Sequence, residues 1–311
     1  MAEPGQHWTV GPGEAGWRLD KYLADAGRLA SRSRASSALE RRKIFVNDRE
    51  ATVEDASLRL TAGDRVRYWA DRPGSARAAV TTTGALAIVY EDAALIVVNK
   101  PPGLLTVPLE RRAGASSVQE QLRDYLRRQH RRAFVVHRID RDTSGLVMFA
   151  KSEAIQAELK GQFRRREPER LYWAVVYGHP SPSQGTWSDH LVWDDRALIQ
   201  KETHPGDPRA AAAESHYRVI ERFAATALIE VSLVSGKRNQ IRIQARLRGH
   251  TLVGEQRYTY GPSDLRPIQF ARQALHARRL RFLHPVDGHE IVVEAEPPDD
   301  LSRLLASLRQ R

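Results

Sequence analysis

One stretch of the chain, FVVHRIDRDTSGLVMFAK at 134–151, constrains the fold more than any other. Two apolar runs, 134–136 and 146–149, flank a charged segment that contains Asp140. Short apolar runs bounded by turn residues are typical of buried strands. The chain is therefore expected to contain a sheet that buries both runs. Asp140 follows the first run, so we expect it at a strand end.

The charged surroundings of Asp140 have two interpretations. Burial at a strand end raises the pKa of a carboxyl group, whereas neighbouring guanidinium groups such as those of Arg138 and Arg141 lower it. Such a balance can produce an ionised, poorly solvated and reactive carboxylate. An aspartate among arginines, taken alone, is more often a structural salt bridge at a sheet edge. The choice between the two depends on the surrounding motif.

The composition points to a polyanionic partner. The 311 residues include 49 Lys and Arg against 38 Asp and Glu, a net charge of +11, and 41% are hydrophobic, which supports a substantial core. Lys and Arg neutralise phosphates and release counterions, so nucleic acid is the expected partner. The absence of cysteine excludes disulfides, cysteine–zinc sites and a thiol nucleophile. With neither a secretory signal nor an apolar run of bilayer length, the protein is expected in the cytoplasm.

The sequence divides into a small and a large domain. Residues 1–16 are rich in Gly and Pro and are expected to form a loose arm. Residues 17–69 combine two helical patterns, a hairpin and a further strand, which predicts a small α+β domain. Residues 70–85 have the composition of a linker. In 86–311, strands and helices alternate irregularly, which predicts an α+β domain with a mixed sheet and flanking helices.

Hydrophobic periodicity locates most elements of the large domain. Strands are predicted in the segments ALAIVYEDAALIVVNK, RLYWAVVYG, TALIEVSLVSG, LRFLHP and EIVVEAE. Helices are predicted in SSVQEQLRDYLRRQHRR, around Ile155, Leu159 and Phe163, in KRNQIRIQARLRGH and in the tail DLSRLLASLRQR. No internal repeat is evident.

The string HRIDRDTSGLVMFAK resembles the signature of the RluA-type pseudouridine synthases, usually H-R-L-D-x-x-T-S-G-L-L followed by an apolar run and Ala-Lys. Other segments resemble further blocks of this family, in the same order: 96–108, 170–178, 234–258 and 272–285. The likeness covers residues 87–300. It implies the pseudouridine synthase fold, with a largely antiparallel central sheet, and an enzyme that isomerises uridine in RNA.

The resemblance also implies a mechanism. Asp140 matches the family's essential aspartate, which acts at the sugar of a uridine either as a nucleophile or as a base. Carboxylates suit the cleavage of a glycosidic bond because they stabilise or trap the developing positive charge. A stacked base is out of reach, so the uridine must be flipped out or taken from a loop. The chemistry requires no metal and no other cofactor.

Four more site residues follow from the resemblance. Arg138 matches the arginine thought to occupy the place of the flipped base, and His137 precedes it. The alternative for Arg138 is an ion pair with a neighbouring aspartate. Tyr172 matches the tyrosine that packs on the uracil, although strand tyrosines are usually plain core. Arg242 matches the arginine that pairs with the catalytic aspartate.

The third motif departs from the family pattern. The usual run G-R-x-H-Q-I-R-x-H reads G-K-R-N-Q-I-R-I-Q here, so Lys237, Asn239 and Gln244 replace an arginine and two histidines. Glu255 stands where aspartate is common. The aspartate, tyrosine and arginine of the site are retained, so activity is expected. The replacements raise the question of which hydrogen bonds take over from the two histidines.

Residues 17–69 resemble the S-four-type RNA-binding domain that precedes many such catalytic domains. Cationic side chains expected to contact phosphates are Arg18, Lys21, Arg32, Arg34, Arg41, Arg42 and Lys43. Any one of them is also compatible with an ordinary solvated helix surface. The domain combination implies action on large-subunit ribosomal RNA, with transfer RNA as the alternative, by a monomeric enzyme.

Three other functions compete with this interpretation. A non-catalytic RNA-binding protein on the same scaffold is disfavoured by the intact site residues. Asp140 and Asp142 could form a glycoside hydrolase pair, but two carboxylates so close on one strand end would not face each other across a sugar at the required ~5 Å or more. His284, His289 and Glu290 could bind a metal, but their spacing fits no standard ligand pattern.

Overall fold

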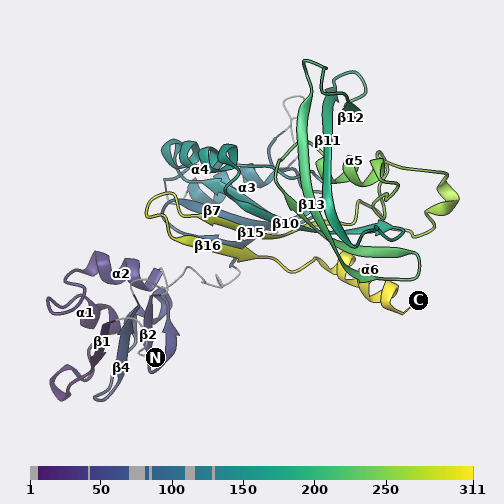
Figure 1. Ribbon diagram of the computed structural model, residues 1–311. Helices are drawn as coiled ribbons and strands as arrows, with labels where there is room; N and C mark the ends of the chain where they lie inside the picture. The colour runs from purple at the N-terminus through teal and green to yellow at the C-terminus, as the bar shows by residue number, and fades with distance from the viewer. Residues whose placement is uncertain are drawn as a thin grey trace. The chain divides into compact units, whose positions relative to one another are not determined.

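The computed structural model of the chain describes residues 6–40, 43–69, 81–83, 86–108, 116–127 and 130–310. The chain divides into two compact units, of which the first runs to residue 77 and the second holds nearly all of the rest. Both units are seen in Figure 1, and each has a hydrophobic core of its own. None of the helices in these ranges is both long enough and apolar enough to cross a membrane.

The first unit packs two helices on a four-stranded antiparallel sheet with the strand order β1-β4-β2-β3. Its elements are β1 (Gln6–Thr9), η1 (Pro12–Glu14), α1 (Leu19–Leu23), α2 (Arg32–Glu40), β2 (Ile44–Val46), β3 (Arg49–Ala51), η2 (Val53–Ser57) and β4 (Arg65–Tyr68). Both predicted helices and the predicted hairpin are confirmed. Ser31 caps α2 by accepting a hydrogen bond from the Arg34 amide at 3.1 Å. Asn47 and Asp48 adopt positive φ angles of 48° and 64°, as a tight two-residue hairpin turn requires.

The expected loose arm at 1–16 is wrong for residues 6–14. Residues 6–9 form β1, which pairs with β4, and 12–14 form a short 3-10 helix. Val10 is buried in the core of the unit and Trp8 packs against it. The Gly-Pro composition concealed a strand that this burial stabilises, while residues 1–5 lie outside the described part. Of the expected linker, only 81–83 are described, as strand β5 (Thr81–Thr83), which pairs with β6.

The second unit is built on a twelve-stranded sheet whose main path runs β12-β11-β13-β14-β10-β15-β9-β7-β6-β5. β16 and β8 pair at the side, with β15 and β9. Along the main path the pairings are antiparallel except that of β15 with β9, which is parallel, and β8 pairs antiparallel with β9. The remaining strands are β6 (Leu86–Glu91), β7 (Leu95–Lys100), β8 (Phe134–Val135), β9 (Ser144–Ala150), β10 (Glu169–Tyr177), β11 (Gln184–Asp194), β12 (Ile199–Thr203), β13 (Ala211–Arg222), β14 (Thr226–Leu233), β15 (Leu275–Leu283) and β16 (Glu290–Glu294). The predicted α+β class with a mixed, largely antiparallel sheet is confirmed.

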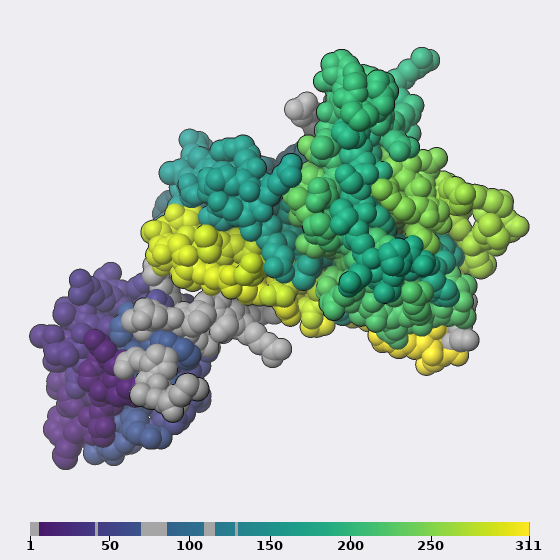
Figure 2. Space-filling model, in the orientation of Figure 1, coloured from purple at the N-terminus to yellow at the C-terminus, as the bar shows by residue number. Residues whose placement is uncertain are grey.

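Helices flank both faces of this sheet (Figure 1). They are α3 (Val118–Arg127), α4 (Glu153–Arg165), α5 (Gln240–Leu247), η3 (Ser263–Leu265) and α6 (Asp299–Arg309). Ser117 caps α3 and bonds Glu120, as its capping-box spacing predicted. In Figure 2 the yellow end of β15 lies next to the teal α4, where the Gln162 amide donates to the Leu283 carbonyl at 2.9 Å.

Strand β10 separates two cores. Tyr172, Ala174 and Val176 pack in the cluster that includes Ile241 and Ala245 of α5. The alternate residues, such as Val175 and Tyr177, pack in the cluster that contains the buried leucines of α6. Successive side chains of a strand point to opposite faces, so Tyr172 necessarily shares its face of the sheet with α5. This alternation brings two distant motifs of the sequence together.

The sequence did not predict strands β11, β12 and β13, which form a long hairpin arm. These strands include polar and charged residues on their exposed positions, and only alternate residues such as Trp187, Leu191 and Ala213 are buried. The apolar runs elsewhere in the chain are continuous and were therefore easier to find. All the strands and helices that were predicted for 86–311 are present, although α5 begins only at Gln240.

Candidate active site

The segment that contains Asp140 is a loop between β8 and β9. β8 ends at Val135, so Asp140 lies in the connecting loop and not at a strand end as expected. The Thr143 amide donates to the Asp140 carbonyl at 3.1 Å, which forms a turn. Gly145 has φ +113°, and a Cβ atom there would lie 2.3 Å from the Ala277 carbonyl oxygen. Only glycine permits this approach of β9 to β15, which fixes where the loop ends.

Hydrogen bonds from the end of β7 and from the segment after it hold the loop in place. Lys100 is fully buried, and its ammonium donates to the carbonyls of Pro101, Leu104 and Arg141 at 3.0, 2.8 and 2.8 Å. Burial lowers the pKa of Lys100 to about 7. The Thr106 hydroxyl donates to the Ile139 carbonyl at 2.8 Å. These bonds fix the backbone on both sides of Asp140. Lys100 was not among the site residues expected from the sequence, although a lysine directly after the apolar strand sequence LIVVN is an unusual placement.

Arg242 of α5 reaches the Asp140 carboxylate. Its Nη1 donates to Asp140 Oδ2 at 3.0 Å, so the pairing expected from the sequence is present. Asp140 Oδ1 has no hydrogen-bond partner among the described residues, and the Asp140 side chain keeps 29% of its exposure. One carboxylate oxygen is therefore held in place while the other is open to a substrate.

Glu255 orients the arginine from its other side. Arg242 Nε and Nη2 donate to the two Glu255 carboxylate oxygens at 2.6 and 2.8 Å, and the Glu255 side chain is 0% exposed. Burial alone would raise the pKa of Glu255, but the Arg242 guanidinium and the amides of Arg257 and Tyr258 outweigh it and hold this pKa below the ordinary value. A bidentate pair of this kind fixes the plane of a guanidinium. Glu255 thus determines the direction in which Arg242 meets Asp140.

Tyr172 completes the constellation from β10. Its side chain is buried to 7% exposure and packs in the same cluster as Ile139 and Ile241. Burial raises the pKa of Tyr172; the Arg170 charge opposes this rise, and the nearby negative charge of Asp140 adds to it. The phenol therefore stays protonated near neutral pH. Its hydroxyl makes no hydrogen bond to any residue in the described ranges, so it is available to a bound base.

His137 and Arg138 lie in contrasting environments. The His137 ring stacks on Phe163 with centroids 5.0 Å apart, and its Nε2 accepts a hydrogen bond from the Met148 amide at 3.2 Å. Burial and the nearby Arg170 charge lower the pKa of His137 to about 3, so the ring is neutral. Arg138 is exposed and forms no ion pair with a described carboxylate, which removes the alternative of pairing with a neighbouring aspartate.

Comparison with known proteins identifies the family. A family model described as RNA pseudouridylate synthase matches residues 94–247. The ribosomal large subunit pseudouridine synthase D of Zymomonas mobilis is 33% identical over 318 residues, which cover 98% of each chain. The ribosomal large subunit pseudouridine synthase C of Vibrio cholerae is 30% identical over 95% of this chain and 94% of its own. The chain belongs to the RNA pseudouridylate synthase family.

A solved structure supports the shared fold. The human RNA pseudouridylate synthase domain containing 4 matches this synthase with a TM-score of 0.59 at 22% identity, over 71% of this chain and 92% of its own. The family relationship confirms the resemblance from the sequence. The protein is an isomerase that converts uridine in RNA to pseudouridine.

Asn239 and Gln244, which replace the two histidines of the family's third motif, form hydrogen bonds of their own. Asn239 accepts from Arg242 Nη1 at 2.8 Å and donates to the Tyr258 hydroxyl at 3.0 Å. Gln244 is fully buried, and its amide nitrogen lies 2.8 Å from the Asp189 carboxylate. Its oxygen accepts from the Ser215 hydroxyl at 2.6 Å. Gln244 thus ties α5 to β11 and β13, and Asn239 links Arg242 to Tyr258.

The predicted RNA-binding cations of the first unit are only partly free. Arg18 forms an ion pair with Asp20 at 2.8 Å, and the Lys21 ammonium lies 4.2 Å from the centre of the Trp17 ring. Arg32 and Arg34 are exposed on α2, whereas Lys43 follows the helix and is half-buried. The remaining two predicted cations, Arg41 and Arg42, lie outside the described residues.

The two other catalytic alternatives fit this structure poorly. Asp142 pairs with Arg141 at 3.1 Å while Asp140 pairs with Arg242, so the two carboxylates are engaged separately and do not form a pair across one site. His284 has both ring nitrogens bonded to carboxylates, with Nδ1 2.7 Å from Asp287 and Nε2 2.9 Å from Asp92. Possible metal-ligand atoms of His284, Asp287 and His289 do lie within 4.8 Å of one another, whereas Glu290 is not part of this group.

Proposed function

We propose that this synthase isomerises uridines of large-subunit ribosomal RNA, with Asp140 as the catalytic group. The observation that carries the assignment is the Asp140 carboxylate, which Arg242 holds through one oxygen and which is close enough to Tyr172 to raise the pKa of its phenol. Relatives that span nearly the whole chain are named as large-subunit synthases, which supports this class of RNA. A ribosomal substrate also fits the cytoplasmic location expected from the sequence.

The reaction redistributes bonds within one nucleotide. Asp140 acts on the sugar as the bond between uracil N1 and C1′ breaks, the uracil turns, and a bond forms between C5 and C1′. The C5 proton is then lost and N1 gains a proton, so atoms and electrons balance without an oxidant or reductant. Arg242 holds the Asp140 carboxylate through Oδ2 and aims it at the sugar. Tyr172 remains protonated and packs on the uracil while it turns.

Access to the uridine requires that it leaves its stack. Arg138 is exposed, has no ion-pair partner in the described part of the chain and lies two residues before Asp140, which suits the role of filling the place of the flipped base. His137 supports Arg138 from within, because its neutral ring is fixed by Phe163 and the Met148 amide. We therefore assign His137 to positioning of the loop and Arg138 to contact with RNA.

Pseudouridine mapping of total RNA tests the assignment. Cells without this gene should lack pseudouridine at one or more positions of large-subunit ribosomal RNA. The wild-type gene and Asp142→Asn should restore them, whereas Asp140→Asn should not. Restoration by Asp140→Asn would refute the catalytic assignment. Missing pseudouridines confined to transfer RNA would instead refute the ribosomal substrate and leave the role of Asp140 intact.

A further inference from the structure

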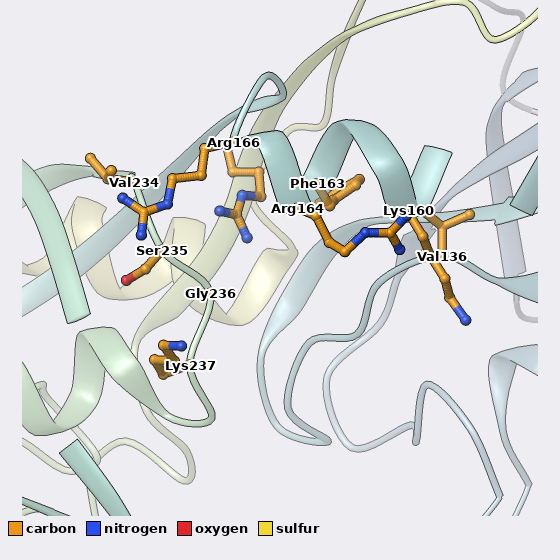
Figure 3. A pocket seen from close by; sticks show the side chains of 10 residues that line it. Val136, Lys160, Phe163, Arg164, Arg166, Val234, Ser235, Gly236 and Lys237 are labelled. Carbon is orange, nitrogen blue, oxygen red and sulfur yellow. The ribbon is translucent and has the colours of Figure 1, made fainter. Parts of the chain in front are cut away.

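A cationic pocket of about 500 Å³ opens in the second unit (Figure 3). It lies between the C-terminal end of α4 and the segment 234–237 that joins β14 to α5. Figure 3 shows Phe163 and Arg164 on the helix side and Lys237 on the opposite side. No carboxylate is among the ten lining residues, and five of them are cations: Lys160, Arg164, Arg166, Arg170 and Lys237.

Arg170 is half-buried at this pocket. Its Nη2 donates to the Leu233 carbonyl at 3.2 Å, but its Nε is buried and has no hydrogen-bond partner in the described part of the chain. Burial lowers the pKa of Arg170. A buried donor without an acceptor is unfavourable, and for a charged group the cost is larger. An anion in the pocket would offset the charge of this guanidinium.

The cations on the helix side are also unneutralised. Arg164 and Arg166 are exposed and form no ion pair with any described carboxylate. Arg165, between them, does not line the pocket and is paired with Glu158 and Glu167 at 3.3 and 2.6 Å. Glu158 and Glu167 thus neutralise Arg165, which does not line the pocket, and the pocket stays positively charged.

The chemistry of the pocket favours an anion over a base. The Phe163 ring stacks on His137 and lies 5.4 Å from the Arg170 guanidinium, so the aromatic surface is already in use. The Ser235 hydroxyl is likewise engaged, because it donates to Gln240 at 2.8 Å. What the pocket still offers is positive charge and unpaired N–H groups, which are the donors that phosphate oxygens accept from.

We infer that this pocket binds a backbone phosphate of the substrate RNA next to the uridine that is isomerised. Arg170 and Tyr172 lie two residues apart on β10, about 7 Å along a strand, and the Arg170 charge acts on the Tyr172 phenol, although the pairing with β15 is irregular between Leu171 and Tyr172. A phosphate on Arg170 would therefore lie within one nucleotide of a uracil on Tyr172. The inference rests on the proposed function for the identity of the RNA, but the contact itself involves the backbone and carries no sequence information.

Salt-dependent binding tests the contact with three matched variants. The probe is a fluorescein-labelled RNA hairpin with a loop of uridines, and the dissociation constant is measured by anisotropy at several salt concentrations. Arg164→Gln and Arg166→Gln should each lower the slope of log K against log salt by about 0.7, the value for one phosphate of a single strand. Arg165→Gln removes the same charge from the same turn and should leave the slope unchanged.

A change of shape without a change of charge separates the pocket from general electrostatics. A Cβ atom on Gly236 would lie 2.6 Å from Arg170 Nη1, so Gly236→Ala must displace the guanidinium. We expect a severalfold rise in the dissociation constant with the single-turnover rate at saturating RNA unchanged. If all three arginine variants give the same slope and Gly236→Ala binds like the wild type, the inference is overturned.

The failure of the proposed function would look different. Release of tritium from large-subunit ribosomal RNA transcribed with [5-³H]uridine reports the reaction. No release by the wild-type protein, together with lower salt slopes for Arg164→Gln and Arg166→Gln but not for Arg165→Gln, would refute the ribosomal substrate and support the phosphate pocket. Normal release with three equal slopes would support the substrate and refute the pocket.

Discussion

Two parts of the second unit use charge in opposite ways. Around Asp140, each charged side chain that reaches the carboxylate is paired: Arg242 bonds both Asp140 and Glu255. In the pocket at the end of α4, the exposed Arg164 and Arg166 have no paired carboxylate within the described ranges. Paired charges fix geometry, whereas unpaired charges remain available to an incoming phosphate. The contrast separates residues that perform the reaction from residues that hold the RNA.

The ion pairs around Asp140 are not explained by a gain in stability of the fold. Burying an ion pair costs desolvation that its attraction only partly offsets, so an apolar pair would often be as stable. The Arg242–Glu255 pair instead fixes a guanidinium that must meet Asp140 from one direction. Changes on this side should therefore alter the rate of the reaction, and changes on the unpaired side should alter affinity for RNA.

The largest expected effect is that of Asp140→Asn. The substitution keeps the shape of the side chain but removes the charge that acts on the sugar. The rate of tritium release should fall by several orders of magnitude, while the dissociation constant for RNA changes little. Asp142→Asn is the matched control, because Asp142 pairs with Arg141 outside this network. Comparable turnover by the Asp140 and Asp142 variants would contradict the division of roles.

Substitutions of Glu255 should have the next largest effect. Glu255→Gln leaves Arg242 with a neutral partner, so its orientation toward Asp140 is weakened, and we expect the single-turnover rate to fall about 100-fold, equivalent to about 2.7 kcal/mol. Glu255→Asp keeps the charge and should lose less. The measurement is the rate at saturating RNA, with thermal unfolding of each variant as the control. Equal rates for wild type and Glu255→Gln would show that Arg242 needs no orienting partner.

The sequence predicts the residues around Asp140 better than it predicts the cationic pocket. Asp140, Tyr172 and Arg242 were found because they lie in motifs whose order is preserved, and their meeting follows from strand alternation and the position of α5. Glu255 was noticed only as a departure from the family pattern. Its role depends on a loop that returns to α5, which local periodicity does not reveal.

The pocket could not be found from the sequence for a related reason. Arg164, Arg165 and Arg166 are consecutive and look equivalent, and only the structure shows which of them is paired. Arg170 is set apart by burial and by the closeness of Gly236, which come from tertiary packing. Likewise, β1 was missed because its stability comes from pairing with β4 and not from its own composition.

Removal of the first unit should affect affinity more than rate. This unit has a core of its own and exposed cations such as Arg32 and Arg34. Like the pocket arginines, these cations are expected to bind RNA and to take no part in the reaction. Deleting residues 1–77 should weaken RNA binding about tenfold and reduce its salt slope, because fewer phosphates are neutralised. The rate at saturating RNA should remain, provided that thermal unfolding shows a folded truncation. A collapse of that rate with an unchanged dissociation constant would make the unit part of the active site.

The smallest effect on the reaction is expected from substitution of His284, whose ion pairs contribute to stability and not to catalysis. Its ring bonds Asp92 and Asp287, and although burial alone would lower the pKa of His284, the two carboxylates raise it above 6.5. Stability from this charge is therefore complete below pH 6.5 and is lost as the pH rises through the raised pKa. The carboxyl group of Asp92 has a lowered pKa and stays ionised across this range.

His284→Gln should therefore cost about 2 kcal/mol in the free energy of unfolding at pH 6. The cost should shrink toward pH 9, where the wild-type ring has lost its proton and forms only neutral hydrogen bonds. Chemical denaturation of both proteins at the two pH values measures the difference, and the single-turnover rate at saturating RNA should be the same for both. A cost that is equal at both pH values would show that packing, and not charge, makes His284 stabilising. A large loss of rate in a stably folded variant would mean that the ion pairs of His284 also support the reaction. The distinction between ion pairs that serve the reaction and those that serve stability would then fail.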